Sequence, residues 1–408
     1  MTDKNFTTIE NVRKQFPAAL ESIYLSVCDR GIMADSTADA LNAYTSAMQG
    51  ASGLKSDHEI VVGEARERFA RLINADASEI AMVSNVSDGM NSIAWAMPWV
   101  PGDNLVIVSD LEHPNNLYPW LRLKQLGIEL RDVAPVDGRI DPEAVLAEID
   151  SRTRLVSCAS VTFSPGLRTD LAAIGMGCRD RGVFFMVDAV QSVGILKHDV
   201  DLECIDGLAT STSKGLLGSY GCGFLYCKSE WANRLNPAYL SRTAVAVSQA
   251  TPSEMGAQDY TLEEGARRFE VGSHNFAGAY AANASLEMLL GVGPEVIETH
   301  VLALAAKLAQ GLADQGLPVF CTSIDKGLSH IVTVGRLGDG GHAITQDSGL
   351  QRWSDHLKSL NVIHTIRRGQ VRFALHVFNS SEDIERVLQM TKGYLSLNPY
   401  NQQLSRSA

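Results

Sequence analysis

The sequence contains little of what marks several specialised classes of protein. Its seven cysteines are odd in number and no two of them form a C-x-x-C pair, so neither a disulfide framework nor a zinc site is expected. No stretch approaches the roughly 18 uninterrupted apolar residues of a membrane-spanning helix. The first residues, MTDKNFTTIENVRKQF, lack the apolar core of a signal peptide. We therefore expect reduced thiols, no metal site, no membrane partner and a cytoplasmic location.

Positive charge is also scarce. The chain has 35 Lys and Arg against 47 Asp and Glu, a formal net charge of -12. Basic residues form short pairs, such as Arg267-Arg268 and Arg367-Arg368, rather than an extended patch. Binding to nucleic acid or to an anionic membrane surface needs a net positive field or a concentrated basic patch. The sequence therefore predicts neither kind of partner.

Short apolar runs alternate with helix-length segments through the first two-thirds of the chain. This alternation predicts an α/β fold, in which a mainly parallel sheet is covered by helices and ligands bind beyond the carboxyl ends of the strands. The expected strands are residues 80–84, 104–109, 154–161, 183–188, 207–212 and 223–227. The expected helices are residues 87–98, 115–126, 141–150 and 170–181, the last capped by Asp170.

The pattern changes after about residue 275. Two Ala/Leu-rich helical stretches fill residues 275–316, and three strands are expected near 329–335, 362–366 and 371–377, before a last helix at 380–397. A chain of 408 residues exceeds the size at which one hydrophobic core keeps growing. We therefore expect a second, smaller α+β domain.

The strongest chemical signal is the segment ATSTSKGLLGSYGCGFLYC, residues 209–227. A predicted strand leads into a Ser/Thr-rich turn, then Lys214, then glycines and a second apolar strand. A lysine that is partly desolvated and held near an aldehyde can form an imine, and the Ser211 and Ser213 hydroxyls can donate to a phosphate. Taken alone, a lysine in such a turn is more often a surface residue.

The second signal is VFFMVDAVQSVG, residues 183–194, in which a buried strand ends at Asp188. A buried carboxylate needs a partner. At this position it can pair with a protonated pyridine nitrogen, and Gln191 can reach a hydroxyl on the same ring. Without that context, Asp188 would be read as a strand-end turn or a helix cap.

Together these segments resemble the class V aminotransferase family of fold-type I enzymes, which use pyridoxal 5'-phosphate (PLP). DAVQSVG is followed, 26 residues after Asp188, by the lysine of STSKGLLGSYGCGF, and the likeness runs from YLSVCDRG to RFALHVFNSSEDIERV. The family includes cysteine desulfurases, selenocysteine lyases, isopenicillin-N-epimerase-like proteins and kynureninases. The resemblance implies PLP on Lys214 as a Schiff base, a large PLP-binding domain at 21–289, and a small domain formed by 1–20 and 290–408.

The resemblance also implies residues that hold the cofactor. SNVSDGMNSIA, residues 84–94, is similar to the loop and helix start that bind the phosphate, through Val86 and Ser87. LEHPNNLYPW, residues 111–120, is similar to the segment whose histidine stacks on the pyridine ring, which is His113 here. Outside this context, Ser87 would be an ordinary residue of a helix start and His113 a loop residue.

Two further residues follow from the resemblance. RRFEVGSHNFAG, residues 267–278, is similar to the stretch whose hydroxyl reaches the phosphate in the neighbouring subunit, so Ser273 implies a homodimer. QVRFALHVFN, residues 370–379, is similar to the strand whose arginine binds the substrate α-carboxylate, which points to Arg372. Without the resemblance, Arg372 would be an ordinary charge at a strand edge.

Three departures from the family pattern restrict the activity. Ser213 replaces the usual histidine beside the lysine, and Phe163 stands where cysteine desulfurases have an asparagine. Desulfurases carry a nucleophilic cysteine shortly before the arginine, but the corresponding segment here, LNVIHTIRRGQVRF, contains no cysteine. The nearest preceding cysteine is Cys321. Desulfurase activity is therefore not expected. Arg367 and Arg368 are instead candidates for receiving an acidic or polar group of the substrate.

The resemblance leaves the reaction type open. Lys214 would act as the general base at the α-carbon of an amino acid, and β-elimination (a C-S or similar lyase) or transamination is favoured over epimerisation of the isopenicillin-N-epimerase type. A catalytically silent PLP-fold binding or regulatory protein is the alternative of another class, although Lys214, Asp188, Gln191, His113 and Arg372 are all kept. A nucleotide-binding protein is disfavoured because neither G-x-x-x-x-G-K-[ST] nor G-x-G-x-x-G follows an early strand.

Overall fold

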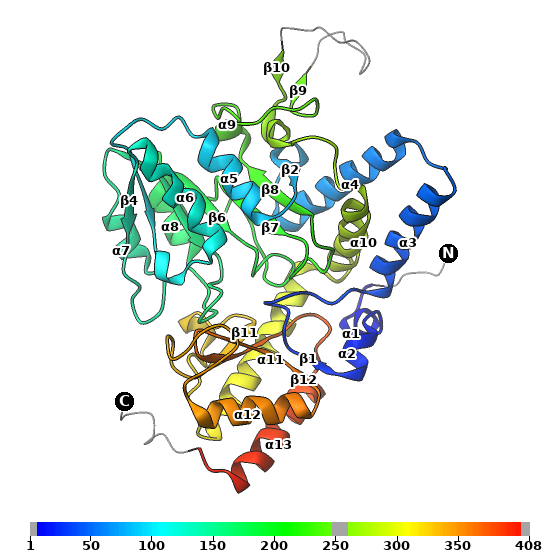
Figure 1. The fold of residues 1–408 in the computed structure, drawn as a ribbon, viewed down its shortest axis with the longest axis vertical. Helices are drawn as coiled ribbons and strands as arrows, with labels where there is room; N and C mark the ends of the chain where they lie inside the picture. The colour runs from blue at the N-terminus through cyan, green and yellow to red at the C-terminus, as the bar shows by residue number, and fades with distance from the viewer. Residues whose placement is uncertain (1–5, 247–259, 401–408) are drawn as a thin grey trace.

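The computed structural model describes residues 6–246 and 260–400. It has a large part built on a seven-stranded sheet and a small part built on a three-stranded sheet. In Figure 1 the large part lies above the small part, and helix α11 (Pro294–Asp314) runs from one into the other. The N-terminal helices α1 (Ile9–Arg13) and α2 (Pro17–Glu21) lie beside the small part, where Arg13 Nη1 lies 2.7 Å from Asp383 Oδ2.

The sheet of the large part is mainly parallel, as expected. Its order is β2-β8-β7-β6-β5-β3-β4, and β8 alone in this sheet runs antiparallel to both its neighbours. Strand β8 follows β7 through a direct loop, which suits an antiparallel neighbour because a parallel one needs a crossover. The strands are β2 (Ile80–Val83), β3 (Asn104–Ile107), β4 (Glu129–Asp132), β5 (Thr153–Ala159), β6 (Phe184–Asp188), β7 (Gly207–Ser211) and β8 (Gly223–Cys227).

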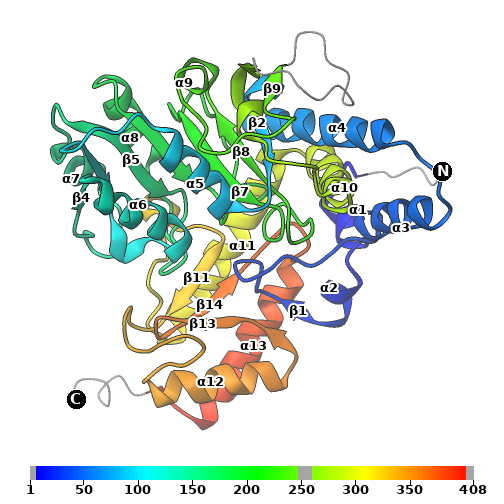
Figure 2. The same ribbon diagram turned by 45° about the horizontal axis from the view of Figure 1, so that its top comes forward.

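Helices bury both faces of the sheet along its inner strands, which explains the apolar runs of β6 and β8. Along β6, Phe184 and Met186 join the cluster around α5 and α6, whereas Phe185 and Val187 join the cluster around α4, α8 and α10. Figure 2 shows helices on the two sides of the strands. The helices are α3 (Asp35–Gln49), α4 (Lys55–Ile73), α5 (Val86–Ala96), α6 (Tyr118–Leu123), α7 (Pro142–Ala147), α8 (Leu171–Arg179), α9 (Ser229–Ala232) and α10 (Phe276–Val292).

Two sequence expectations need correction in the large part. The helix expected at 115–126 is broken into a turn at Pro114–Asn116, then α6, then a turn at Lys124–Leu126. Pro119 lies in the first turn of α6, where its missing N–H costs nothing, so the helix starts anew there. Helices α3 and α4 were not predicted at all. Asp170 caps α8 as expected, accepting from Ala173 N–H.

The small part has an antiparallel sheet in the order β11-β14-β13, with Thr365 and Thr333 on either side of Arg372. Its elements are β11 (Ile331–Val334), β13 (Thr365–Arg367), β14 (Gln370–Ala374), α12 (Ser348–Ser359) and α13 (Ser381–Leu397). Strand β1 (Ile23–Tyr24) pairs in parallel with β12 (Val362–Ile363), and β9 (Val245–Ala246) pairs with β10 (Thr261–Leu262). The domain boundaries at residues 20 and 289 stay a prediction.

Helix α11 is long and apolar enough to cross a membrane if length and composition alone are considered. Its apolar residues Ile297, Val301, Leu304 and Leu308 are nevertheless buried in the main hydrophobic cluster. This pattern is typical of a core helix.

Candidate active site

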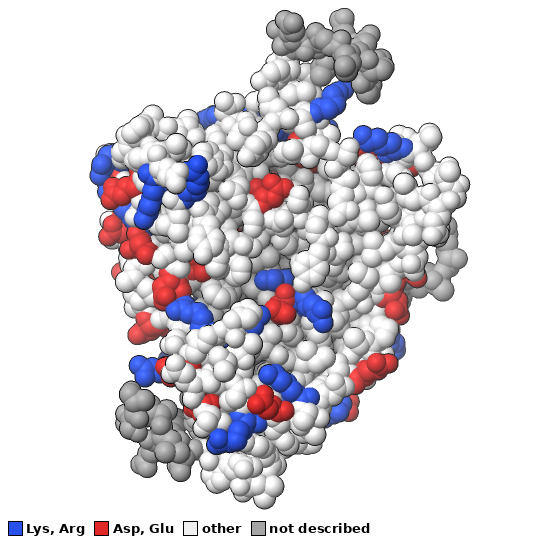
Figure 3. Space-filling view, viewed as in Figure 1, with Lys and Arg blue, Asp and Glu red and all other residues white. Residues whose placement is uncertain are grey.

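A cavity of about 770 Å³ lies at the carboxyl ends of β6 and β7, where the large and small parts meet. Eight predicted site residues line it: Val86, Ser87, His113, Gln191, Ser211, Ser213, Lys214 and Arg372. Near the centre of the face drawn in Figure 3, basic and acidic side chains lie side by side, and elsewhere on that face the two signs are interspersed. The eight predicted residues that line this cavity come from five separate segments of the sequence.

Lys214 lies in the turn that follows β7. The backbone of an N-terminal segment packs against this turn, because Gly31 N–H donates to Ser213 O at 2.7 Å. Burial lowers the pKa of Lys214, and the nearby Arg372 guanidinium lowers it further, whereas the Asp188 carboxylate acts in the opposite direction. A larger share of this amine is therefore neutral, as a nucleophile or a base requires.

Asp188 and Gln191 are buried polar residues that lack full hydrogen bonding. Asp188 is 3% exposed, and its Oδ1 accepts from Val190 N–H at 3.0 Å. Burial raises the pKa of Asp188 to about 6. Gln191 Nε2 donates to Cys28 O at 3.0 Å, while its Oε1 is buried with no partner among the described residues. Such groups call for a bound molecule with a cationic nitrogen and a hydroxyl.

The N-terminus of α5 forms the other end of the cavity. Asn85 caps this 11-residue helix by accepting from Asp88 N–H, and Val86 N–H donates to Ser211 Oγ at 2.9 Å. The hydroxyl residues Ser87, Ser211 and Ser213 surround the positive end of the helix dipole, which favours an anion. With the polar groups of Asp188 and Gln191, this arrangement fits the phosphate and the pyridine ring of PLP.

His113 lies between these two ends of the cavity. Its ring meets the edge of Phe163 at a centroid distance of 5.4 Å and an angle of 88°, and its Nδ1 accepts from Asn115 N–H at 3.2 Å. Burial, helped by the positive charges of Lys214 and Arg372, lowers the pKa of His113 to about 4. The imidazole is therefore neutral at neutral pH and suited to stacking on an aromatic ring.

Arg372 points into the cavity from β14 and is 2% exposed. Its Nε donates to Thr365 Oγ1 at 3.1 Å and its Nη1 to Phe163 O, and no carboxylate among the described residues pairs with it. A buried guanidinium without an acidic partner is a ready receptor for a carboxylate. The binding of a substrate α-carboxylate by Arg372 stays a prediction.

The two neighbouring arginines differ from each other. Arg367 lines the cavity but is already paired with Asp29, Nη2 to Oδ1 at 2.7 Å. Arg368 pairs with Asp110 at 2.9 Å and is not among the residues that line the cavity. The cavity geometry thus supports a substrate contact by Arg367 more than one by Arg368.

Ser273 is exposed and lies outside the cavity of Lys214. It lines a separate hollow of about 50 Å³, together with Asn275 and Cys222. Its predicted contact with the phosphate of a neighbouring subunit stays a prediction, because the structure holds one chain.

Several lining residues had no role in the sequence analysis: Cys28, Asp29, Asn115, Tyr220 and His342. Cys28 and Asp29 stand in YLSVCDRG, which contributed to the family likeness but carried no chemical signal of its own. Cys28 Sγ lies 3.9 Å from Thr365 Oγ1, across 337 positions of sequence. Only the three-dimensional structure brings this thiol to the site.

Glu112 is a buried carboxyl directly before His113. Its Oε2 accepts from Asn116 Nδ2 at 2.7 Å, and its Oε1 accepts from the backbone N–H of Ala159 at 2.8 Å, at the end of β5. Burial raises the pKa of Glu112 to about 8, despite these hydrogen bonds, and the Asp188 carboxylate adds to the increase. The carboxyl group therefore anchors the His113 loop to the sheet mainly in its neutral form.

We expect a Glu112→Gln variant to flatten the dependence of stability on pH. The pKa of Glu112 is raised from its ordinary 4.5 to about 8 in the folded chain, so its contribution to stability is fully present below about pH 4.5 and lost as the pH rises through about 8. The melting temperature of the wild type should therefore drop further between about pH 6 and about pH 9 than that of the variant. Scanning fluorimetry measures this, with exposed Glu143→Gln as control; equal slopes for Glu112→Gln and wild type would contradict it.

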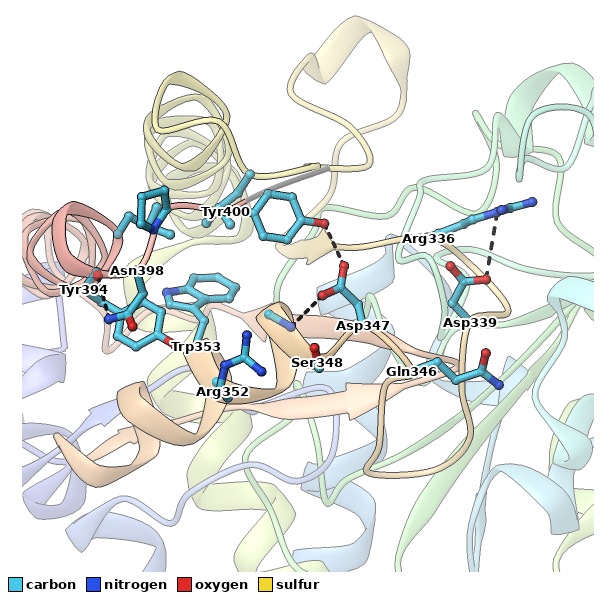
Figure 4. A pocket seen from close by; sticks show the side chains of 14 residues that line it. Arg336, Asp339, Gln346, Asp347, Ser348, Arg352, Trp353, Tyr394, Asn398 and Tyr400 are labelled. Atoms are coloured by element: carbon cyan, nitrogen blue, oxygen red, sulfur yellow. Dashed lines mark hydrogen bonds and ion pairs between the residues drawn. The ribbon is translucent and has the colours of Figure 1, made fainter. Parts of the chain in front are cut away.

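A second cavity, of about 420 Å³, lies in the small part between α12 and the end of α13 (Figure 4). Tyr400 donates to Asp347 Oδ2 at 2.8 Å there, and the other oxygen of Asp347 caps α12. None of the predicted site residues lines this cavity. The hydrogen bond from Tyr400 holds the end of the described chain against the start of α12.

Comparison with known proteins agrees with this geometry. The Aminotransferase class-V family model matches residues 32–387. A probable cysteine desulfurase of Methanothermobacter thermautotrophicus is 29% identical over 397 residues, covering 93% of this chain and 96% of that one. An uncharacterized aminotransferase of Bacillus subtilis is 28% identical over 380 residues, with the same two coverages. The apo structure of a cysteine desulfurase from Thermococcus onnurineus NA1 superposes with a TM-score of 0.82 at 24% identity, covering 95% of this chain and 98% of that chain.

Proposed function

Because this chain belongs to the class V aminotransferase family and is therefore a PLP-dependent enzyme, we propose that it eliminates a β-substituent, such as a sulfur group, from an α-amino acid. The observation that carries this proposal is the meeting of Lys214, Gln191, His113 and Arg372 around one cavity. Asp188 is not among the residues that line it, but it is buried within electrostatic reach of Lys214. Relatives named as cysteine desulfurases favour cleavage at a carbon-sulfur bond. Transamination is the second candidate, because a relative of equal coverage is named an aminotransferase.

The residues of the chain divide the work of the reaction. Bound PLP supplies an aldehyde that takes the substrate amine and a ring that accepts the electron pair left at Cα. The Lys214 amine removes the Cα proton, aided by a lowered pKa, and Arg372 holds the substrate carboxylate so that this proton faces the amine. Asp188 holds a proton on the ring nitrogen, which keeps the ring an acceptor of electrons. Neutral His113 would stack on the ring and exclude water from it.

The assembly and the location belong to the same proposal. Ser273 is exposed and outside its own chain's cavity, which suits a hydroxyl that completes the site of a partner subunit in a homodimer. Free thiols at all seven cysteines suit the cytoplasm. Size-exclusion chromatography with light scattering would test the dimer.

The reaction can be identified by its products. PLP-loaded protein is incubated with a panel of amino acids in deuterated water, with and without a 2-oxo acid, and the products are followed by mass spectrometry. β-Elimination predicts ammonia and an oxo acid without any added oxo acid. Products that require the added oxo acid would establish transamination instead, and deuterium at Cα with inversion would establish epimerisation. No exchange at Cα with any amino acid would contradict the whole proposal and favour a catalytically silent protein.

A further inference from the structure

Cys28 lies on a segment that bridges the two parts of the molecule. On the side of the small part, Leu25 O accepts from the backbone N–H of Ala374, in the strand of Arg372, at 2.8 Å. On the side of the large part, Gly31 N–H donates to Ser213 O at 2.7 Å, beside Lys214. Cys28 stands between these two anchors and is 2% exposed. Its position is therefore fixed relative to both the lysine and the strand of Arg372.

Cys28 lies close to residues that we expect to bind the substrate. Its Sγ lies 3.9 Å from Thr365 Oγ1, and the same Oγ1 accepts from Arg372 Nε at 3.1 Å. A negative charge on this sulfur would raise the pKa of both Lys214 and Arg372, so the thiol is within electrostatic reach of both cations. A substrate whose carboxylate is bound by Arg372 and whose Cα faces Lys214 would therefore lie within reach of the same thiol.

Other features of the cavity indicate that this space takes a ligand. Gln191, whose amide nitrogen donates to Cys28 O, keeps a buried Oε1 without a partner among the described residues. Arg372 lacks an acidic partner within the described chain. Cys28 is thus part of an incompletely satisfied polar site.

The other six cysteines are placed differently. Cys222 also lines the cavity, but burial raises its pKa to about 12 and it lies beside Thr212. Cys204 is the most accessible of the seven and lies away from the cavity, at the end of Arg179. Cys158, Cys178, Cys227 and Cys321 are buried outside the cavity. Only Cys28 presents its sulfur near both Lys214 and Arg372.

We propose that Cys28 is the nucleophile that accepts the sulfur atom when this enzyme acts on an amino acid bearing a β-thiol. This inference rests on the proposed PLP-dependent cleavage at Cβ and deepens it by naming the substrate class and the acceptor. Cys28, near the N-terminus, would thus take the part of the nucleophilic cysteine that is missing before Arg372.

The step balances without an added oxidant. The Cys28 sulfur gives up its proton and forms a bond to the substrate sulfur, and the bond between that sulfur and Cβ breaks. The bonding pair goes to Cβ, which takes a proton and leaves as a methyl group. Each of the two sulfur atoms loses one electron and Cβ gains two. One cysteine and one Cys28 thiol thus become one alanine and one Cys28 persulfide.

The test uses the PLP-loaded holoenzyme with L-cysteine and no other thiol. The wild type should release about one alanine per chain, and the Cys28 peptide should gain one sulfur atom by mass spectrometry after alkylation. Cys28→Ser and Cys28→Ala should lower this alanine at least about tenfold while pyruvate and ammonia persist. Cys204→Ser, which removes the most accessible thiol, should behave as the wild type.

The absorbance of the bound cofactor is measured first, to show that each variant is folded and loaded with PLP. Alanine formed equally by Cys28→Ser and wild type, or a persulfide on another cysteine, would overturn the role of Cys28. Pyruvate and ammonia without alanine from the wild type would also overturn it and leave β-elimination standing. A wild type that forms no product and exchanges no Cα proton with any amino acid would overturn the proposed function as well.

Discussion

A Lys214→Ala variant is expected to lose at least about 10³-fold in turnover of any amino-acid substrate. The buried, partly neutral amine is the base that removes the Cα proton, and it is also the group that would bond to the cofactor aldehyde. Removing it takes away both functions while leaving the cavity larger by one side chain. Steady-state kinetics of the PLP-loaded variant measures the first loss.

The second loss is visible without turnover. The wild type should be yellow, and borohydride should bleach it and fix the cofactor to the Lys214 peptide. The Lys214→Ala variant should retain no cofactor after borohydride treatment and denaturation. Lys358→Ala, which removes an exposed lysine of α12, should match the wild type in both respects. A colourless wild type that ignores added PLP, or a covalent label in Lys214→Ala, would show that the cofactor is not held in this way.

Arg372→Leu is expected to have the second-largest effect. A buried guanidinium paired with a substrate carboxylate contributes about 2–5 kcal/mol, so kcat/KM should fall roughly 30-fold to several thousand-fold, with much of the change in KM. Arg372→Lys should lie between this variant and the wild type, because an ammonium group carries the charge but not the planar fork of donors.

The substrate and the variant together provide a sharper test of Arg372. An amine that lacks the carboxylate should be processed poorly by the wild type and no worse by Arg372→Leu, because the missing contact is the same in both cases. Arg336→Ala, at an arginine of the small part that is 80% exposed, should leave KM within about twofold. An unchanged KM in Arg372→Leu would show that the α-carboxylate is bound elsewhere.

The sequence allowed six of the seven strands of the large sheet to be predicted, because burial on both faces leaves apolar runs along the inner strands. Strand β4 was missed because it lies at the edge of the sheet and its residues, ELRD, are exposed or half-buried. Phe184, Phe185, Met186 and Val187 pack into clusters on opposite faces, so the strand before Asp188 shows no polar interruption. Helix α3 was missed for the converse reason, since only Ser36 and Thr37 are buried along it and no apolar stripe marks its face.

The site residues that the sequence identified lie on short segments with several diagnostic neighbours. Asp188 is the last residue of β6 and Lys214 follows β7, and because these strands pair side by side, the two residues lie near each other. Cys28 was missed because its neighbours Thr365 and Arg372 are more than 300 positions away. The ion pair between Arg367 and Asp29 was missed for the same reason. Because this pair occupies part of the guanidinium, Arg367 has fewer donors left for a substrate.

The pairing of β1 with β12 also has a consequence for folding during synthesis. Ile23 leaves the ribosome early but meets Val362 only when nearly the whole chain has been synthesised. The strands that carry Lys214 and Asp188 are complete by residue 227, the end of β8, whereas β14, which brings Arg372, emerges much later. A nascent chain thus acquires the means to capture an aldehyde before the means to select an amino acid.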